Sequence, residues 1–303
     1  MKVSKTLSKM ARDWQWYLLL APAIVYFAIF SYGPMYGVQI AFKDFRASRG
    51  IWGSAWVGFT QFERFFNSYY FWDLIRNTMV ISVYGLIVGF PLPIILALCI
   101  NELKNGRFKS TIQTVTYAPH FISTVVFCGM IIAFLRPTTG VINNIIMLFG
   151  GKKTAFLSDP IAFPSIYVWS DVWQNVGWGS IIYLATLSGI DVALYEAATI
   201  DGATRFQRVK YINIPLLIPI IVTLLILNSG RVLSVGYEKT LLLQNNLNLK
   251  TSEVISTFVY KSGLLQAQYS FSAAVGLFNS VINIFILFFV NKISQTVSEN
   301  SLW

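Results

Sequence analysis

Metal ligands and reactive thiols are scarce in this chain. Its 303 residues include a single histidine, His120, and two cysteines, Cys99 and Cys128, both inside apolar runs. One histidine cannot form a metal cluster, and cysteines in such runs are most often small buried hydrophobic residues. The sequence therefore favours neither a metal site nor a disulfide.

The chain also lacks the GxxxxGK[ST] pattern of a phosphate-binding loop. The stretch GGKKT at 150–154 has no glycine at the required upstream spacing. No set of nucleophile, base and orienting group is recognisable either. We therefore expect no catalytic residues and no cofactor bound by this chain.

Charged residues make up only 12% of the sequence, whereas 55% is hydrophobic and the mean hydropathy is +0.59. Soluble domains have about 25% charged residues, so this composition predicts a membrane protein. The net charge of +10 then favours contact with lipid headgroups rather than with nucleic acid. Six runs are long enough to cross a bilayer as helices, at 14–42, 77–101, 110–135, 164–190, 211–235 and 268–291.

The predicted fold is therefore an all-α polytopic membrane protein, with one transmembrane domain over 14–303 behind a basic flank at 1–13. The fourth run is the most polar, which suits a helix lining an internal cavity. Pro91 and Pro93 fall inside the second run, where we expect a kink and not a break. The first run is longer than the apolar part of a signal peptide, so we expect it to remain as an anchor.

The orientation of the chain across the membrane can be predicted from the number of Lys and Arg residues in the segments that connect the spans. With the N-terminus in the cytoplasm, the inner segments carry as many basic residues as the outer segments but are much shorter. Their higher density of positive charge favours cytoplasmic N- and C-termini.

The segment EAATIDGATRFQRVKYINIP, residues 196–215, interrupts the apolar runs. Asp191 suits the N-cap of a short helix, and Gly202 suits the left-handed residue that ends it. Thr204 and Gln207 have the spacing of a capping box that opens a second helix, and Pro215 stands near the start of the fifth run. The loop 191–212 is therefore predicted to form a helical hairpin outside the membrane.

Two functions remain open for this hairpin on spacing alone. Ala197 and Ala198 permit close approach of another protein, and Tyr195 and Phe206 offer apolar area for docking. Alternatively, Arg205 and the basic residues after it rest on lipid phosphates.

The same stretch resembles the EAA motif of permeases of binding-protein-dependent ATP-binding-cassette (ABC) importers. The motif is EAA, three residues, G, nine residues, I, one residue, L and P. Six positions match at the right spacing: Glu196, Ala197, Ala198, Gly202, Ile212 and Pro215. Asp201 and Ala203 extend the match, and Ile214 replaces the usual leucine.

Three further segments are similar to oligosaccharide permeases of the LplB type, which are found mostly in Gram-positive bacteria. They are YGPMYGVQIAFKDF, YAPHFIS and the stretch from STFVYKSG to FVNKIS. The resemblance implies the type I ABC importer permease fold, with a cytoplasmic EAA coupling helix between the fourth and fifth spans. It also implies oligosaccharide import across the cell membrane, or, as an alternative, import of another solute class.

The resemblance further implies several partners. They are a second homologous permease forming a heterodimer, two copies of a cytoplasmic ABC ATPase that hold ATP and Mg, and an extracellular solute-binding lipoprotein. Residues 196–203 would form the docking surface on the ATPase, Gly202 would supply the bend, and Phe206 would pack into the ATPase groove. Closing of the ATPase dimer would then rotate the membrane helices.

A sugar path needs hydrogen-bonding side chains and aromatic faces at membrane depth, where polar groups are costly. The candidates are Tyr117, His120, Trp173, Gln174, Asn175, Trp178, Asn228, Arg231, Asn279 and Asn283. Each could instead join helices within the bundle, and for His120 a packed histidine is the better interpretation. Arg231 could bind an acidic sugar, pair with Asp171 or lie at the outer interface.

Two other classes of function are disfavoured by the sequence. A proton-coupled carrier would need a relay of intramembrane carboxylates, and Asp171 alone is available. A membrane enzyme would need a clustered acid and base, which the sequence does not contain.

Overall fold

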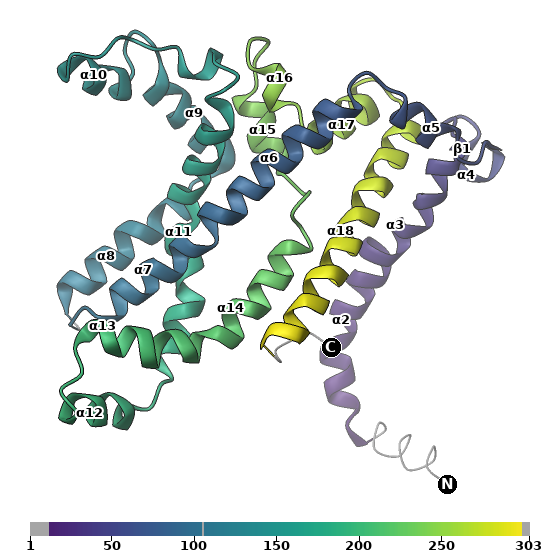
Figure 1. Cartoon of the computed structure of the whole chain (residues 1–303). Coiled ribbons are helices and arrows are strands. Elements are labelled where there is room, and N and C mark those ends of the chain that lie inside the picture. The colour runs from purple at the N-terminus through teal and green to yellow at the C-terminus, as the bar shows by residue number, and fades with distance from the viewer. Residues whose placement is uncertain (1–11, 105, 299–303) are drawn as a thin grey trace. The chain divides into compact units, whose positions relative to one another are not determined.

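The computed structural model describes residues 12–104 and 106–298, which form helices joined by short turns, with one two-stranded sheet (Figure 1). The prediction of a helical membrane fold is confirmed. Four described helices are long and apolar enough to span a membrane, and two bent helix pairs raise that number to as many as six. Most of the predicted flank 1–13 lies outside the described residues. The chain divides into two compact units, one of residues 1–66 and 262–277 and one of residues 67–261 and 278–303.

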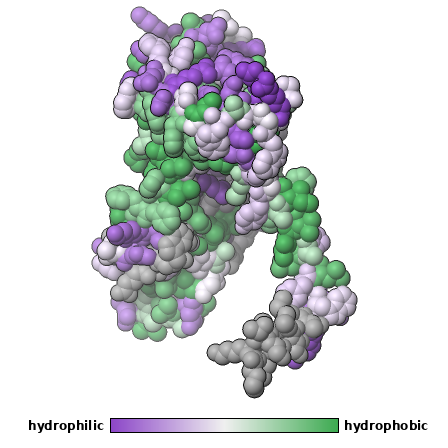
Figure 2. Space-filling model, turned by 90° about the vertical axis from the view of Figure 1, so that its right-hand side faces the viewer, coloured by the Kyte–Doolittle hydropathy of each residue, from purple (hydrophilic) through white to green (hydrophobic). Residues whose placement is uncertain are grey.

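The first unit begins with one long helical stretch, Trp14–Phe42, which coincides with the first predicted span. It consists of α2 (Trp14–Phe27), a π-helical segment (Ala28–Tyr32), α3 (Gly33–Met35) and a 3₁₀ segment (Tyr36–Phe42). None of its most apolar window is buried within the chain, and Figure 2 shows α2 as a column of hydrophobic side chains. Such a surface is suited to lipid or to another apolar subunit.

The rest of the first unit is a small cap at the end of this helix. Strands β1 (Lys43–Asp44) and β2 (Ala55–Trp56) pair antiparallel around α4 (Gly50–Gly53), and α5 (Thr60–Phe66) follows. The Phe45 N–H donates to Ser270 Oγ at 2.8 Å, and Arg64 donates to Gln268 Oε1 at 2.8 Å. These bonds join the cap to the beginning of α18 (Tyr269–Ser298), whose remaining turns belong to the second unit.

The second unit is organised around α11 (Phe163–Ser188), which packs against α6 (Phe71–Gly89) and α7 (Pro91–Asn101). As predicted, the second run is not interrupted by its prolines, since Phe71–Asn101 forms one candidate span. α11 also approaches α8 (Arg107–Tyr117) closely, because a Cβ at Gly177 would lie 2.1 Å from the Thr116 carbonyl oxygen. The fourth run, the most polar, thus forms the centre of this unit.

The third predicted span, 110–135, is not one helix. α8 continues into a 3₁₀ turn (Ala118–Phe121), and α9 (Thr124–Leu135) then leaves at an angle of 103°. Pro119 opens the 3₁₀ turn, and Ile122 and Ser123 have extended backbones. The prediction used the length of the uncharged run, and that criterion cannot reveal a bend inside the run.

Several other observed span boundaries also differ from the predicted ones. The second span begins at Phe71 rather than 77, because Asp73 and Arg76 cut the uncharged run short. The fifth is a helix over Arg205–Ser229 rather than 211–235, and the sixth continues beyond 291. Charged residues therefore occupy helix ends that a search for uncharged runs leaves out.

The second unit contains several further helical segments, most of them short. They are α10 (Val141–Leu148), a 3₁₀ turn (Phe156–Ser158), α12 (Val192–Ile200), α13 (Arg205–Arg208), a π-helical segment (Val209–Asn213), α14 (Ile214–Ser229), α15 (Tyr237–Leu243), α16 (Leu249–Ser252), α17 (Ile255–Tyr260) and a π-helical segment (Lys261–Leu265) that ends in the first unit. Within this unit α10 lies at one end and α12 at the other (Figure 1).

Candidate functional site

Residues 191–208 form two short helices joined by a tight turn, here called the α12–α13 hairpin. The Asp191 carboxylate accepts the Ala193 N–H at 2.9 Å, as expected of an N-cap. Gly202 has a φ of +75° and ends α12. The Gly202 N–H donates to the Thr199 carbonyl at 3.1 Å, and the Ala203 N–H donates to the Ala198 carbonyl at 2.9 Å. This is the hydrogen-bond pattern of a Schellman C-cap, so the turn needs its glycine.

The second arm of the hairpin begins with the predicted capping box. The Thr204 N–H donates to Gln207 Oε1 at 2.7 Å, and the Gln207 N–H donates to Thr204 Oγ1 at 3.3 Å. This arm does not stop before the membrane run, because the helix continues from Arg205 to Ser229. The π-helical segment Val209–Asn213 precedes Pro215, which has no N–H to continue the regular ladder.

The tip of the hairpin exposes large apolar side chains. Ile200 is 87% exposed and Phe206 is 75% exposed, on either side of Gly202. Glu196 and Ala197 are exposed beside them, whereas Ala198 and Ala203 are partly covered. Large apolar groups that are exposed at a turn and belong to neither hydrophobic cluster indicate a contact with another molecule.

A side-chain hydrogen bond ties α12 to the segment that precedes α14. Tyr195 Oη donates to Asn213 Oδ1 at 2.6 Å, and Asn213 is completely buried. Partial burial raises the pKa of the Tyr195 phenol, so the group stays protonated and able to donate near neutral pH. Tyr195 therefore fixes α12 against the start of α14.

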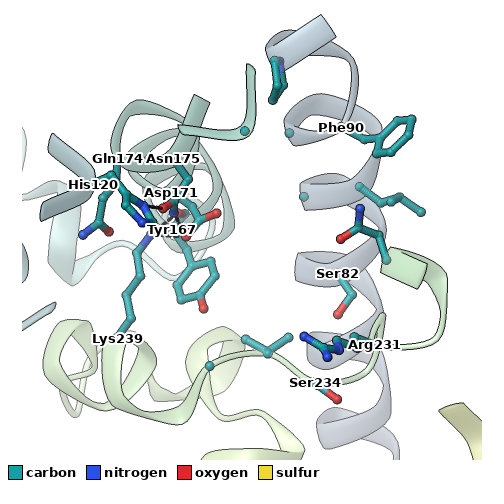
Figure 3. Close-up of a pocket in the computed structure, with 18 of the residues that line it drawn as sticks. Ser82, Phe90, His120, Tyr167, Asp171, Gln174, Asn175, Arg231, Ser234 and Lys239 are labelled. Atoms are coloured by element: carbon teal, nitrogen blue, oxygen red, sulfur yellow. Dashed lines mark hydrogen bonds and ion pairs between the residues drawn. The ribbon is translucent and has the colours of Figure 1, made fainter. Parts of the chain in front are cut away.

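A cavity of about 1010 Å³ lies within the second unit, between α6, the 3₁₀ turn before α9, α11, and the segment from the end of α14 to α15. In Figure 3, one side of the cavity gathers His120, Gln174, Asn175, Asp171 and Lys239, and the other side carries Ser82, Phe90 and Arg231. Aromatic, amide and charged groups thus face a common space at the upper end of the usual ligand-pocket size.

Four of these side chains form a continuous chain of hydrogen bonds. His120 Nδ1 lies 3.0 Å from Asn175 Oδ1, the Asn175 amide donates to Asp171 Oδ1 at 3.3 Å, and Lys239 Nζ donates to the same oxygen at 3.2 Å. The His120 ring also stacks on Trp178, with centroids 4.6 Å apart. These contacts fix the position of the polar groups on one wall.

Lys239 is the buried member of this series of hydrogen-bonded side chains. Its side chain is only 7% exposed, whereas that of Asp171 is 52% exposed. Nζ also donates to the Tyr167 carbonyl at 3.1 Å and lies 4.6 Å from the centre of the Tyr167 ring. Removal from water lowers the pKa of Lys239, and the Asp171 carboxylate opposes that shift. Asp171 is thus both the counter-ion of Lys239 and an open acceptor in the cavity.

The predicted path residues divide into two groups. Five line the cavity: His120, Gln174, Asn175, Asn228 and Arg231. The Gln174 amide donates to the Ile122 carbonyl at 3.1 Å and so stabilises the bend between the 3₁₀ turn and α9. Arg231 is exposed and does not form an ion pair within the described residues, so its expected alternative pairing with Asp171 is not observed.

The other five predicted path residues, Tyr117, Trp173, Trp178, Asn279 and Asn283, are not among those that line the cavity. Trp178 stacks on the ring of His120 and so supports the cavity wall from behind. Trp173 packs on Phe127, with ring centroids 5.2 Å apart. Asn283 is buried, accepts the Leu233 N–H at 3.0 Å and donates to Ser234 Oγ at 3.2 Å. It therefore holds the turn that carries Arg231.

Sequence reasoning missed two functional candidates. Lys239 follows the fifth run and has no sequence feature that marks it as buried; only the packing of α15 on α9 reveals it. Ile200 lies inside the predicted docking range 196–203 but was not singled out there, although it could have been noted as an apolar residue next to the turn.

Comparisons with known proteins agree with this geometry. Residues 89–299 match the family described as binding-protein-dependent transport system inner membrane component. The chain is 42% identical to protein LplB of Bacillus subtilis (strain 168), covering 98% of this chain and 93% of that protein. It is 38% identical to the polygalacturonan/rhamnogalacturonan transport system permease protein YteP of the same organism, covering 100% and 94%.

The chain is also similar to solved structures. A chain in the crystal structure of a bacterial ABC transporter for import of the acidic polysaccharide alginate has a TM-score of 0.88 and 40% identity, with 97% of this chain and 99% of that chain covered. The same values hold for that transporter bound to a periplasmic protein carrying an alginate pentasaccharide. The chain therefore belongs to the family of inner membrane components of binding-protein-dependent ABC transport systems.

Proposed function

We propose that this chain is the permease subunit of an ATP-driven importer that moves acidic oligosaccharides across the cell membrane. The observation that carries the proposal is a polar and aromatic cavity in the same unit as an exposed apolar hairpin. The hairpin offers a site for an ATPase, and the cavity offers a site for a sugar. The chain's similarity to permeases for polysaccharide fragments supports the substrate class.

The α12–α13 hairpin is the ATPase-docking element in this proposal. Its EAA residues and the exposed Ile200 and Phe206 contact one of two ATPase subunits, which bind ATP and Mg and hydrolyse the nucleotide. The hairpin and both termini are then cytoplasmic, and the six runs act as six spans. A second, homologous permease completes the path, and an extracellular binding lipoprotein delivers the sugar. The resemblance to permeases of the LplB type also leads us to propose a Gram-positive bacterium as the host.

Reconstitution tests this function directly. The permease pair, the ATPase and the binding protein are placed in proteoliposomes, and uptake of a labelled oligosaccharide is measured with and without ATP. Uptake that requires both ATP and the binding protein is expected. Equal uptake without the ATPase subunits would contradict the proposal.

Arg231 is the candidate for selecting an acidic substrate, because its exposed guanidinium lines the cavity without an ion pair in the described chain. Guanidinium binds carboxylate in a bidentate, charge-assisted manner. We expect Arg231→Gln to lower uptake of a uronic oligosaccharide about tenfold, as for a charged hydrogen bond worth about 1.5 kcal/mol. Uptake of a reduced, neutral analogue that still binds the binding protein changes little. An equal loss for both sugars would remove Arg231 as a charge selector.

The bond between Tyr195 and Asn213 is expected to transmit movement of α12 to α14. Tyr195→Phe leaves Asn213 Oδ1 buried without its partner, at a cost of about 1–3 kcal/mol. We expect ATP hydrolysis to continue while sugar transported per ATP falls. Tyr211→Phe is the matched control, because Tyr211 is 66% exposed on the same segment. An unchanged transport ratio in Tyr195→Phe would show that the bond has no coupling role.

A further inference from the structure

α10 turns its apolar side chains away from the rest of the protein. At 100° per residue, one arc of about 120° holds five apolar residues of α10 and its C-cap. They are Val141, Ile142, Ile145, Leu148 and Phe149, all exposed. Leu148 and Phe149 are 84% and 89% exposed. On the side away from this arc, Asn143 is completely buried. This is the reverse of the pattern of a helix on a water-soluble surface.

Asn143 fixes the helix in this orientation. Its Nδ2 donates to the Arg136 carbonyl at 3.1 Å and to the Thr154 carbonyl at 3.0 Å, and its Oδ1 accepts the Thr154 N–H at 2.8 Å. One side chain thus joins the two ends of the loop that contains α10. Turning the apolar arc inward would break all three bonds, so the arc stays outward.

The charge around α10 is of one sign. Residues 136–158 contain Arg136, Lys152 and Lys153 and no aspartate or glutamate. An apolar face flanked by basic residues is the composition of a helix that lies in the membrane–water interface. Basic residues near a membrane surface each gain about 1 kcal/mol from anionic lipids. The flanking charges therefore complement anionic phospholipid headgroups, and the apolar arc complements the acyl chains below them.

The location of α10 agrees with an interfacial position. It directly follows α9 and precedes α11, whose opposite end leads to α12. In Figure 1 it runs across the direction of α6 and α11 rather than along it. A helix with this direction at the end of a membrane bundle lies along the bilayer surface.

We propose that α10 is an interfacial anchor on the side of the membrane opposite the α12–α13 hairpin. Its apolar arc lies at the acyl boundary, and Arg136, Lys152 and Lys153 contact anionic phospholipid headgroups. The proposal depends on membrane insertion of the chain and not on the identity of the transported sugar.

Spin labels on neighbouring residues test this position. Cys99 is exposed and is replaced by serine, whereas the buried Cys128 can remain. A label is then placed by Leu148→Cys, and by Met147→Cys as the matched control, because Met147 is exposed but lies outside the apolar arc. The assembled transporter is studied in nanodiscs of equal phosphatidylglycerol and phosphatidylcholine, and in phosphatidylcholine alone.

At position 148 we expect a several-fold higher ratio of oxygen to nickel-chelate collisions than at position 147. The ratio falls in discs without phosphatidylglycerol, and Lys152→Gln with Lys153→Gln removes that lipid dependence. Equal ratios at the two positions would overturn the proposal. So would protection of position 148 that appears only after the binding protein is added, since the occupant would then be protein.

Discussion

Gly202→Val is expected to reduce sugar uptake at least tenfold while the chain still reaches the membrane. Gly202 has a φ of +75°, where a residue with a Cβ, above all a β-branched one, costs about 1–2 kcal/mol. The Schellman bonds to Ala198 and Thr199 depend on that conformation. Their loss displaces Ile200 and Phe206 from the shape that we propose the ATPase recognises. Uptake and ATPase activity of the reconstituted complex are the measurements.

Gly202→Asn is the matched variant, because asparagine tolerates the left-handed conformation. A Cβ at this position meets nothing within 4 Å in the chain, so the asparagine side chain fits the isolated hairpin. We expect it to retain most of the uptake if backbone conformation alone matters. A loss as large as that of valine would instead place an ATPase surface against Gly202. Normal uptake in Gly202→Val would contradict the role of the hairpin.

Asp171→Asn is expected to destabilise the second unit, because it leaves the ammonium of Lys239 buried without its counter-ion. Breaking a fully buried ion pair costs about 3–5 kcal/mol. The cost here lies at or below that lower limit, since Asp171 is 52% exposed to the cavity and water replaces part of its effect. Thermal unfolding of the purified chain measures the loss, with Glu196→Gln, on an exposed glutamate of the same unit, as the control for a simple loss of one negative charge.

A double variant and a pH series distinguish charge from packing at this pair. Adding Lys239→Met to Asp171→Asn is expected to recover much of the stability, because no charge is then buried. In Asp171→Asn alone, the pKa of Lys239 falls further below its usual 10.5. The native state then releases its proton at a lower pH than the unfolded chain, so stability rises with pH between those two pKa values. A pH-independent loss would contradict this account.

The hairpin could be predicted closely from the sequence because its determinants are local. The N-cap at Asp191, the left-handed Gly202 and the capping box at Thr204 each depend on residues at most a few positions away. The existence of long apolar helices was also predictable, since composition and run length suffice for it. Even here the ends were misplaced, because Asp73 and Arg76 lie within the helix that begins at Phe71.

The cavity was only partly predictable because it depends on packing between distant segments. Three of the polar residues predicted for a sugar path, His120, Asn175 and Arg231, line the cavity. The same criterion gave Asn283 a place on the path, whereas the structure uses it to hold a backbone turn. Lys239 looked like an ordinary loop lysine, and its burial follows from the way α15 packs on α9.

The absence of a break between α13 and α14 has a mechanical consequence. Arg205–Ser229 forms a continuous helix of 25 residues, which is about 37 Å long at 1.5 Å per residue. One end belongs to the hairpin, and the other end lies two residues before Arg231. A tilt of about 5° at the hairpin moves the far end of a rod of this length by about 3 Å. In the function proposed above, the helix that would receive force from an ATPase would therefore also change the distance between Arg231 and the opposite wall of the cavity.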